Sequence, residues 1–213
     1  TTIFERVLPG PDRMYPDTDS KPISISEEMI RQAAESCPED VHLRLKQMRT
    51  WKIPADSFTF ILKKNLFPLI RRIIDDFGED PVFVGVLIGQ QLKHLEGQLQ
   101  PASPFDTDKV HRLFAFARER GLHRAVLRPM LPVLYEHPNM DFESILTTID
   151  YRPAAVDDIT GHIPSLRAKF QAINTSKRPE APADWIMGKL QPLALGNMDP
   201  AELRRLVEEG NHA

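Results

Sequence analysis

The chain has 213 residues, of which 41% are hydrophobic and 27% are charged, so it can form one ordinary domain or two small ones. Its formal net charge of −3 argues against a protein coated in positive charge, although a local basic face remains compatible with it. A single cysteine, Cys37, excludes an internal disulfide, and no apolar run approaches the ~18 residues of a membrane span. We therefore expect a cytoplasmic protein outside the membrane.

The first 22 residues differ from everything that follows. The stretch RVLPGPDRMYPDTD, residues 6–19, is rich in proline and charge. Each proline fixes its own φ and moves the preceding residue out of the helical region. Residues 1–22 are therefore predicted to be extended.

Helix signals begin directly after this segment. Ser24 or Ser26 can cap a first helix, with acidic residues in its first turn. Predicted helices follow at about 26–36, 40–51, 55–64 and 66–77. Leu43, Leu45 and Met48 are the expected apolar contacts of the second helix, and Gly78 is the expected C-terminal cap of the fourth.

A buried helix is predicted over about 81–97, where the first two turns are apolar on nearly every side. Gly85 and Gly89 are four residues apart and share one face of it. Because glycine weakens a soluble helix by up to ~1 kcal/mol relative to alanine, we expect both to allow a neighbouring segment to approach closely.

Residues 100–108 read as a linker, and we predict a domain boundary there. Further helices are expected at about 108–120, 123–135, 141–148, 157–173, 183–195 and 199–209. Pro129 and Pro132 favour a kink, and Pro164 predicts that the helix of 157–173 is divided in two. No stretch of β alternation follows residue 22. The predicted fold is all-α, with two small helical domains in tandem, 23–104 and 105–213, after the extended segment 1–22.

No motif for unaided catalysis is present. The chain lacks a Gly-rich phosphate loop, a nucleophile elbow and an HExxH-type metal pair. The pairs Asp75–Asp76 and Asp157–Asp158 are adjacent on helices, where neighbouring side chains point about 100° apart. We therefore predict neither catalytic residues nor metal ligands in this chain.

The strongest chemical signal is a local excess of basic residues between positions 109 and 128. Its members are Lys109, Arg112, Arg118, Arg120, Arg124 and Arg128, with His111 and His123. Glu119 is the one acidic residue among them in the sequence. On a helix, Lys109, Arg112 and Arg120 share one arc, beside an apolar arc that can pack. Such a face can neutralise nucleic-acid phosphates, but it can equally be an ordinary solvated surface.

A second basic group lies on the helix predicted over 40–51. It consists of Arg44, Lys46, Arg49 and Lys52. Neither an RNA-recognition sheet nor a KH loop is indicated. Any RNA binding is therefore expected to use shape and phosphate contacts on a helical scaffold.

The opening segment resembles the end of the catalytic domain in the E subunit of archaeal-type Glu-tRNA(Gln) amidotransferase. The family pattern there runs Arg-x-Leu-Pro-Gly-x-x-Arg-Met-Tyr-Pro-(Glu/Asp)-Thr-Asp. The residues Thr1, Thr2, Arg6, Leu8, Pro9, Gly10, Arg13, Met14, Tyr15, Pro16, Asp17, Thr18 and Asp19 fit it. Looser matches are Asp80-Pro81 before a buried helix, Gly121 with 123–131 after it, and the motif Trp185-Ile186-Met187-Gly188. The sister family of B subunits fits less well.

The resemblance implies that the chain is the C-terminal half of this protein, with a helical domain and a YqeY-like tail that hold the tRNA body. The complete subunit would use ATP and Mg²⁺ to activate the γ-carboxylate of Glu-tRNA(Gln). Ammonia from an asparaginase-like glutaminase partner would then give Gln-tRNA(Gln). The chain itself would lack the kinase-like active site and would need no cofactor.

The clustering of the basic residues and the resemblance together assign residues to this role. Arg6, Arg13, Tyr15, Asp17 and Asp19 would lie at the edge of the catalytic domain. The expected tRNA(Gln) contacts are Lys109, Arg112, Arg120, Arg124, Lys93 and Lys189. No contact with DNA or a membrane is expected.

The sequence departs from the family pattern near its end. Where the family tail commonly carries Arg-Gly-Lys, this chain has Leu195, Gly196 and Asn197, so the end of the tail is expected to bind RNA less. Two other interpretations stay open. The chain can be a helical module that docks the glutaminase partner without contacting RNA, or a structural tail whose basic face is only solvated.

Overall fold

A computed structural model describes residues 24–37, 39–173 and 178–209. Within these ranges the chain forms helices and no strands, which confirms the all-α prediction. Contacts divide the chain into two units, residues 1–40 and 41–213, each described here by itself. The segment 1–22, predicted to be extended, lies outside the described residues.

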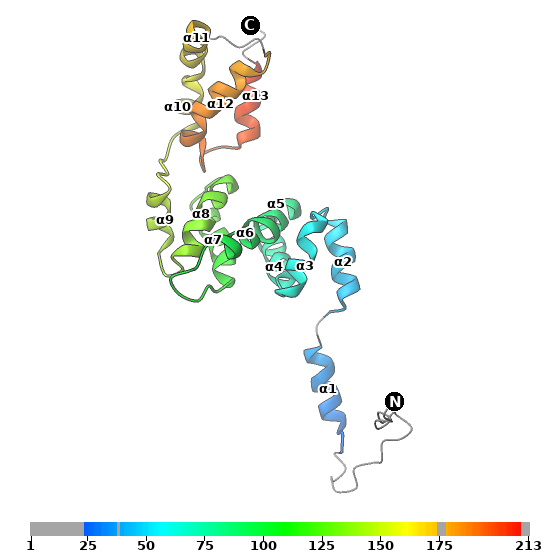
Figure 1. The fold of residues 1–213 in the computed structure, drawn as a ribbon. Helices are drawn as coiled ribbons and strands as arrows, with labels where there is room; N and C mark the ends of the chain where they lie inside the picture. The colour runs from blue at the N-terminus through cyan, green and yellow to red at the C-terminus, as the bar shows by residue number, and fades with distance from the viewer. Residues whose placement is uncertain (1–23, 38, 174–177, 210–213) are drawn as a thin grey trace, which may run out of the picture. The chain divides into compact units, whose positions relative to one another are not determined.

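Short helices follow one another along the chain (Figure 1). The first are α1 (Glu27–Ser36), α2 (Val41–Thr50), η2 (Ala55–Ser57), α3 (Phe58–Lys63), α4 (Phe67–Phe77), α5 (Pro81–Val86), η3 (Leu87–Leu92) and α6 (Lys93–Gln98). They are followed by α7 (Asp108–Glu119), η4 (Arg124–Val126), α8 (Leu127–Glu136), α9 (Phe142–Thr148), α10 (Val156–Gly161), α11 (Ile163–Ile173), α12 (Ala181–Ala194) and α13 (Pro200–Glu209).

Helix α1 is capped as the sequence predicts. The Ser26 hydroxyl accepts a hydrogen bond from the backbone N–H of Met29 at 3.2 Å, and Glu27 and Glu28 occupy the first turn. None of the residues of α1 is buried. Local capping and charge, rather than packing, therefore define this helix.

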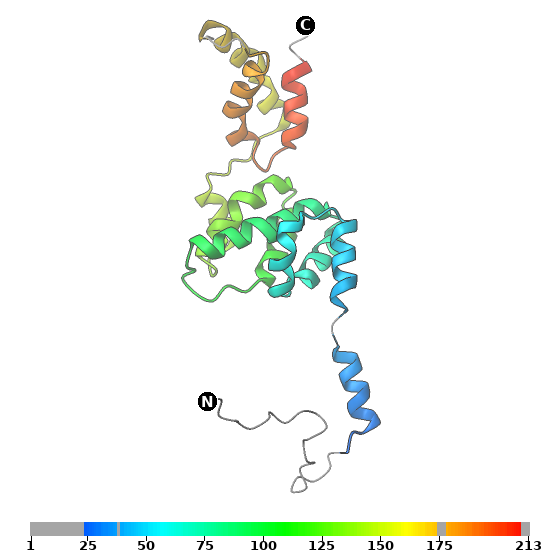
Figure 2. The ribbon, with the colours of Figure 1, turned by 45° about the vertical axis from the view of Figure 1, so that its right-hand side comes forward.

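The first hydrophobic core joins helices α2 to α9 into what we call the body. Its fully buried large side chains include Met48, Phe67, Ile70, Leu87 and Leu113. Helix α4 ends at Gly78, whose φ of +68° is the left-handed conformation expected of a C-terminal cap. Figure 2 shows these helices packed around one another.

The helix predicted over 81–97 is present and contains a π-helical segment, η3, between α5 and α6. Its two glycines permit the predicted close approach. A Cβ on Gly85 would lie 2.7–2.9 Å from the side chain of Ile53, and one on Gly89 would lie 2.5 Å from Cβ of Ser57. The neighbouring segment is therefore the loop and turn before α3.

Two of the three predicted apolar contacts of helix α2 are confirmed, because Met48 is fully buried and Leu45 packs against the first core. Leu43, expected to pack, is 55% exposed, whereas Arg44 is buried beside Met48. The Arg44 guanidinium lies over the Phe67 ring and donates a hydrogen bond to Asn65 Oδ1 at 2.8 Å. Arg44, rather than Leu43, is therefore the buried member of this pair of neighbours.

A second, smaller core joins helices α10 to α13 into what we call the tail. Ile159, Ile186, Leu203 and Val207 are its most buried members. The predicted division at Pro164 is confirmed, because α10 ends at Gly161 and α11 begins at Ile163. Pro132, by contrast, lies inside α8, which continues to Glu136.

The two cores do not divide at the predicted linker of residues 100–108. The first core extends to Leu146 and the second begins at Ile159. Helix α7 follows the linker but packs on α4, which precedes it, so the segment 100–108 is a loop within the body. In the described part of the chain, the two hydrophobic cores are therefore separated after α9 and not at residue 104.

The turn that follows α12 connects the tail to the body. The His123 backbone N–H donates a hydrogen bond to the Gly196 carbonyl at 2.8 Å. Asn197 Oδ1 accepts from the Tyr151 hydroxyl at 3.0 Å, and its Nδ2 donates to the Arg152 carbonyl at 2.7 Å. Leu195 packs against the first core.

Among the described residues, none of the helices combines the length and the apolar character that crossing a bilayer would require.

Candidate nucleic-acid interface

Helix α7 presents the two faces that the sequence predicts. Val110, Leu113, Phe114 and Ala117 are buried against the first core. The basic residues lie on the remaining surface of the helix and in the segment that follows. Their accessibility and partners decide what this surface can bind.

Lys109 and Arg112 lie near the loop before α7 and the α8–α9 turn. The Lys109 ammonium donates to the Pro138 carbonyl and, at 3.3 Å, to Asn139 Oδ1. The Arg112 guanidinium pairs with the Asp106 carboxylate at 2.9 Å, and its side chain is 58% exposed. Arg112 can therefore reach solvent, while Lys109 is half-buried and occupied.

Arg120 and Arg124 have different neighbours. Arg120 pairs with Glu143 of α9 and is 58% exposed. Arg124 pairs with Glu79 at 3.6 Å and lies over the ring of Phe83, 5.0 Å from its centroid. The contacts of Arg120 therefore point towards α9, and those of Arg124 towards α5.

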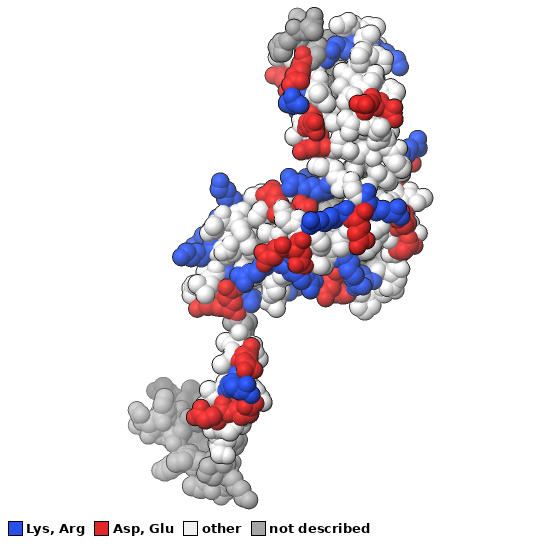
Figure 3. All heavy atoms as spheres, turned by 180° about the vertical axis from the view of Figure 1, so that it is seen from behind, with Lys and Arg blue, Asp and Glu red and all other residues white. Residues whose placement is uncertain are grey.

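Acidic residues from other parts of the chain accompany this basic surface. In the sequence, Glu119 is the one acid between Lys109 and Arg128, but Asp106, Glu143 and Glu79 reach its cations in space. Figure 3 shows red and blue side chains interleaved over one face. The surface is mixed in charge rather than uniformly basic.

The other two predicted contacts are exposed. Lys93 lies on α6 and makes no ion pair within the described ranges. Lys189 lies on α12 over the Trp185 ring, 5.6 Å from the ring centroid. The second basic group on α2 does not form a complete charged face, because Arg44 is buried.

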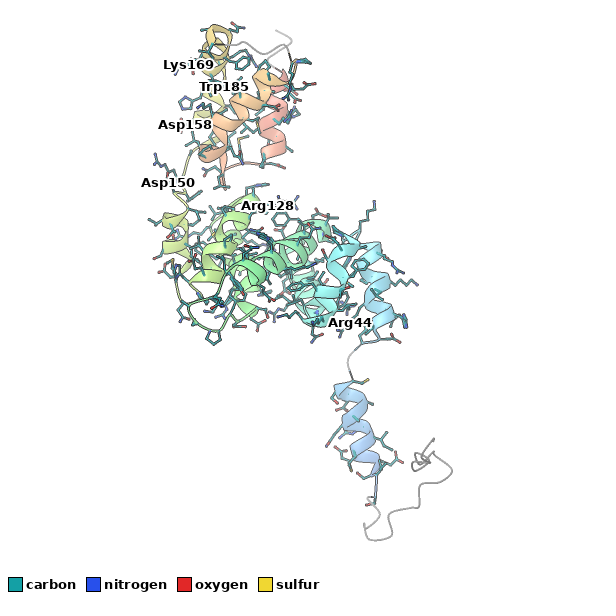
Figure 4. The ribbon with its side chains drawn as sticks, in the orientation of Figure 1. Arg44, Arg128, Asp150, Asp158, Lys169 and Trp185 are labelled. Atoms are coloured by element: carbon teal, nitrogen blue, oxygen red, sulfur yellow. The ribbon has the colours of Figure 1, made fainter. Side chains whose placement is uncertain are left out.

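A cleft of about 810 Å³ lies between the body and the tail, within the unit 41–213. Its lining residues are Phe83, His123, Arg124, Ala125, Arg128, Pro129, Met187, Gly188, Gln191, Pro192, Ala194, Leu195, Asp199, Pro200, Ala201 and Leu203. Arg128, labelled in Figure 4, lies at the start of α8 with its guanidinium 5.6 Å from the Phe83 ring centroid. The cleft thus combines cations, an aromatic ring and an apolar wall.

The site residues predicted from the sequence include only one member of this cleft, Arg124. Arg128 belongs to the basic stretch, and Met187 and Gly188 belong to a motif that had no assigned role. Trp185 and Ile186 of that motif pack in the second core. The next two residues, Met187 and Gly188, line the cleft. Half of the motif therefore packs in the second core and the other half faces the cleft.

His123 lies at the edge of the cleft and is partly buried. Burial lowers the pKa of its imidazole; the nearby Asp199 carboxylate opposes this shift and Arg124 adds to it. The His123 Nδ1 accepts a hydrogen bond from the Ala125 N–H at 3.3 Å, which requires an unprotonated Nδ1. The neutral form of His123 therefore suits this site.

The remaining predicted residues, Arg6, Arg13, Tyr15, Asp17 and Asp19, lie outside the described residues. Among the residues that are described, the acidic, histidine and cysteine side chains form no group of three or more that could hold a metal ion.

Comparison with curated proteins finds relatives that share one name, the E subunit of glutamyl-tRNA(Gln) amidotransferase. The chain is 21% identical to the protein of Saccharolobus solfataricus over 214 residues, covering 97% of the chain and 32% of the relative. It is 26% identical to that of Pyrococcus furiosus over 145 residues, covering 68% and 23%. For Methanopyrus kandleri the identity is 22% over 142 residues, covering 66% and 22%.

No family model matches the chain, and no solved structure matches it. The chain spans between about a fifth and a third of the length of these curated relatives. The sequence similarity nevertheless extends far beyond the motif in residues 6–19. The resemblance of this chain to the E subunit of archaeal-type Glu-tRNA(Gln) amidotransferase is thereby confirmed over most of its length.

Proposed function

We propose that this chain is a tRNA-binding helical region of a Glu-tRNA(Gln) amidotransferase and that it holds the body of tRNA(Gln) through phosphate contacts. The observation that carries this proposal is the similarity to the amidotransferase relatives over most of the chain, together with the exposed arginines of α7 and the segment after it. The parent complex would be a ligase acting in the cytoplasm in protein biosynthesis. It would use ATP and Mg²⁺ and take ammonia from a glutaminase partner.

The ion pairs on this surface are compatible with phosphate binding. Arg112 and Arg120 are each 58% exposed and paired with one carboxylate. Exposed ion pairs of this kind contribute only about 0–1 kcal/mol to stability. Each guanidinium can therefore exchange a carboxylate for a phosphate at little cost, and counterions released from the RNA favour the exchange.

A salt titration of tRNA binding tests the proposal with the double variant Arg112→Ala/Arg120→Ala. The variant is expected to bind different tRNAs more weakly by similar factors, because phosphate contacts carry little sequence information. The slope of log affinity against log salt should fall by roughly one for each lost contact.

The matched control is Arg204→Ala/Arg205→Ala on α13. These arginines are also exposed and paired with carboxylates, those of Glu208 and Glu209, so the change in net charge is the same. The control is expected to bind tRNA as the unmodified chain does. Equal affinities and slopes for both double variants would contradict the assignment of the α7 surface.

The same experiment separates the alternative functions. A chain that docks the glutaminase partner without contacting RNA, or that only supports the fold, would show no salt-dependent tRNA affinity. In the first case Arg112→Ala/Arg120→Ala would instead weaken binding of the purified glutaminase. The surface is mixed in charge, with Asp106 and Glu143 beside the arginines. Binding of the glutaminase therefore has to be measured alongside binding of tRNA.

A further inference from the structure

The cleft between body and tail has walls of different chemistry, and its volume of about 810 Å³ is within the range of small-molecule sites. One wall comes from α5, η4 and the start of α8. The other comes from α12 and the residues after it. A ligand in the cleft would therefore contact segments that are far apart in the sequence.

Two guanidinium groups on the first wall share one aromatic ring. Arg124 and Arg128 lie 5.0 and 5.6 Å from the centroid of the buried Phe83 ring. Cation–π attraction orients both groups. Arg124 is also paired with Glu79, whereas Arg128 is exposed and has no carboxylate partner among the described residues. Arg128 is thus the cation most available to an anionic ligand.

The opposite wall is apolar, with an opening at Gly188. A Cβ at Gly188 would have no atom within 4 Å beyond its own helix. Met187 and Pro192 lie beside it, and Gln191 adds a carboxamide. Glycine is an unfavourable residue inside a helix, and packing does not require it here. It does leave the backbone of α12 accessible to a flat group.

The acidic group at the edge of the cleft is already engaged. One Asp199 carboxylate oxygen accepts the N–H of Ala201 at 2.8 Å and so caps the start of α13. The other lies 3.9 Å from Nε2 of His123. Asp199 therefore has a local hydrogen-bond partner at the start of α13, while Arg128, at the cationic end of the cleft, has no carboxylate partner in the described part of the chain.

We propose that this cleft receives one unpaired nucleotide from a loop of the bound RNA, an inference that rests on the proposed tRNA-binding function. Its base lies against Gly188 and the neighbouring apolar wall, and its phosphate pairs with Arg128. Bases that are splayed out of a helix stack on aromatic side chains and guanidinium planes, and an apolar wall likewise removes the flat face of a base from water. Two other ligands fit the cleft less well. A simple inorganic anion would make no contact with the apolar wall, and the bases of an RNA duplex are stacked inside the helix and cannot enter the cleft.

The proposal is tested by filling the cleft with Gly188→Leu and by removing its cation with Arg128→Ala. Each variant is measured with intact tRNA(Gln) and with a blunt RNA duplex that has no unpaired nucleotides. Loss of one base stacked on an aromatic side chain weakens binding by about 5- to 150-fold; because the wall here is apolar but not aromatic, a loss near the lower end of this range is expected for tRNA. Affinity for the duplex should stay unchanged in Gly188→Leu and fall only slightly in Arg128→Ala.

Gly161→Leu is the matched control, because Gly161 is also helical with open space around it and lies outside the cleft. It should bind both RNAs as the unmodified chain does. Thermal unfolding of each variant shows whether it is folded; should Gly188→Leu fail to fold, Arg128→Ala and the milder Gly188→Ala carry the test.

The outcomes separate the two proposals. If the unmodified chain binds no tRNA, the proposed function fails. If it binds tRNA but both cleft variants bind with unchanged affinity, the cleft inference is overturned while the function stands. Equal losses for tRNA and duplex would also overturn it, because the cleft would then contribute only general electrostatic attraction.

Discussion

At the scale of single residues, glycines in this protein have two different uses. Gly85 and Gly89 lie where another segment touches the helix, with no room for a Cβ. Gly97, near the end of the same helix, has open space where a Cβ would lie, with no neighbouring atom within 4 Å. Replacement by alanine is therefore expected to destabilise the protein at Gly85 or Gly89 but not at Gly97, because only the first two have a neighbouring segment in contact.

Gly89→Ala is expected to destabilise the protein. Its Cβ would lie 2.5 Å from Cβ of Ser57, and overpacking of about 1–3 kcal/mol exceeds the gain of up to ~1 kcal/mol in helix propensity. Gly97→Ala is the control and should be neutral or stabilising by up to about 1 kcal/mol. Urea unfolding of both variants measures the difference. A stable Gly89→Ala would show that the helix can move away from Ser57.

His123 is expected to make stability depend on pH. Burial lowers the pKa of its imidazole in the folded state, and unfolding returns it towards the usual value near 6.5. The unfolded chain then binds a proton more readily, so stability is complete above about pH 6.5 and decreases as the pH falls below it. Stability at about pH 7 and about pH 5.5, on either side of that value, measures this decrease.

His123→Gln should make the loss of stability at low pH smaller, because glutamine keeps a hydrogen-bonding side chain and does not titrate. The control is His162→Gln, at an exposed position between α10 and α11; it should leave the decrease as it is. Identical pH profiles for His123→Gln and the unmodified chain would contradict the assignment.

At the scale of elements, the turn after α12 has a structural role at the positions where the chain departs from the basic pattern of the amidotransferase E subunits that it resembles. Leu195 packs on the first core, and Gly196 has a φ of +76°. The side chain of Asn197 makes hydrogen bonds with four partners: the hydroxyl of Tyr151, the carbonyls of Arg152 and Leu193, and the N–H of Ala154. These three residues connect tail and body instead of presenting cations.

Asn197→Ala is therefore expected to lower the free energy of unfolding by about 1–3 kcal/mol, the cost of leaving partly buried polar groups without partners. Asn139→Ala is the control: its amide also has two hydrogen bonds, of 3.3 Å each, but both are exposed to solvent, so the change should be less than about 0.5 kcal/mol. Urea unfolding measures both. An Asn197→Ala variant as stable as the control would show that the turn does not depend on this side chain.

At the scale of the whole molecule, the chain is expected to bind tRNA without catalysing the amidation of Glu-tRNA(Gln). The resemblance to the catalytic domain of the family is confined to residues 1–22, and the chain covers only 32% of the Saccharolobus solfataricus relative. The chain supplied with Glu-tRNA(Gln), ATP, Mg²⁺ and ammonia should therefore form no Gln-tRNA(Gln). Aminoacyl-tRNA analysis measures this, and turnover by the purified chain would contradict the expectation.

Several helix ends could be predicted from the amino-acid sequence, because capping residues and prolines act on their neighbours in the chain. Ser26 begins α1, Gly78 ends α4 and Pro164 separates α10 from α11, as local rules predict. The apolar face of α7 and the close approach at Gly89 could also be inferred from spacing alone. The motif of residues 6–19 indicated the resemblance to amidotransferase E subunits that the comparisons confirm.

How these helices pack together and which side chain lies beside each charge could be seen only in the three-dimensional structure. It buried Arg44 in place of Leu43 and placed Asp106 and Glu143 beside the arginines of the α7 surface. It also carried the first core across the predicted boundary at 104. Ion pairs and clefts join segments far apart in the chain, and helical periodicity contains no information about which segments will be neighbours.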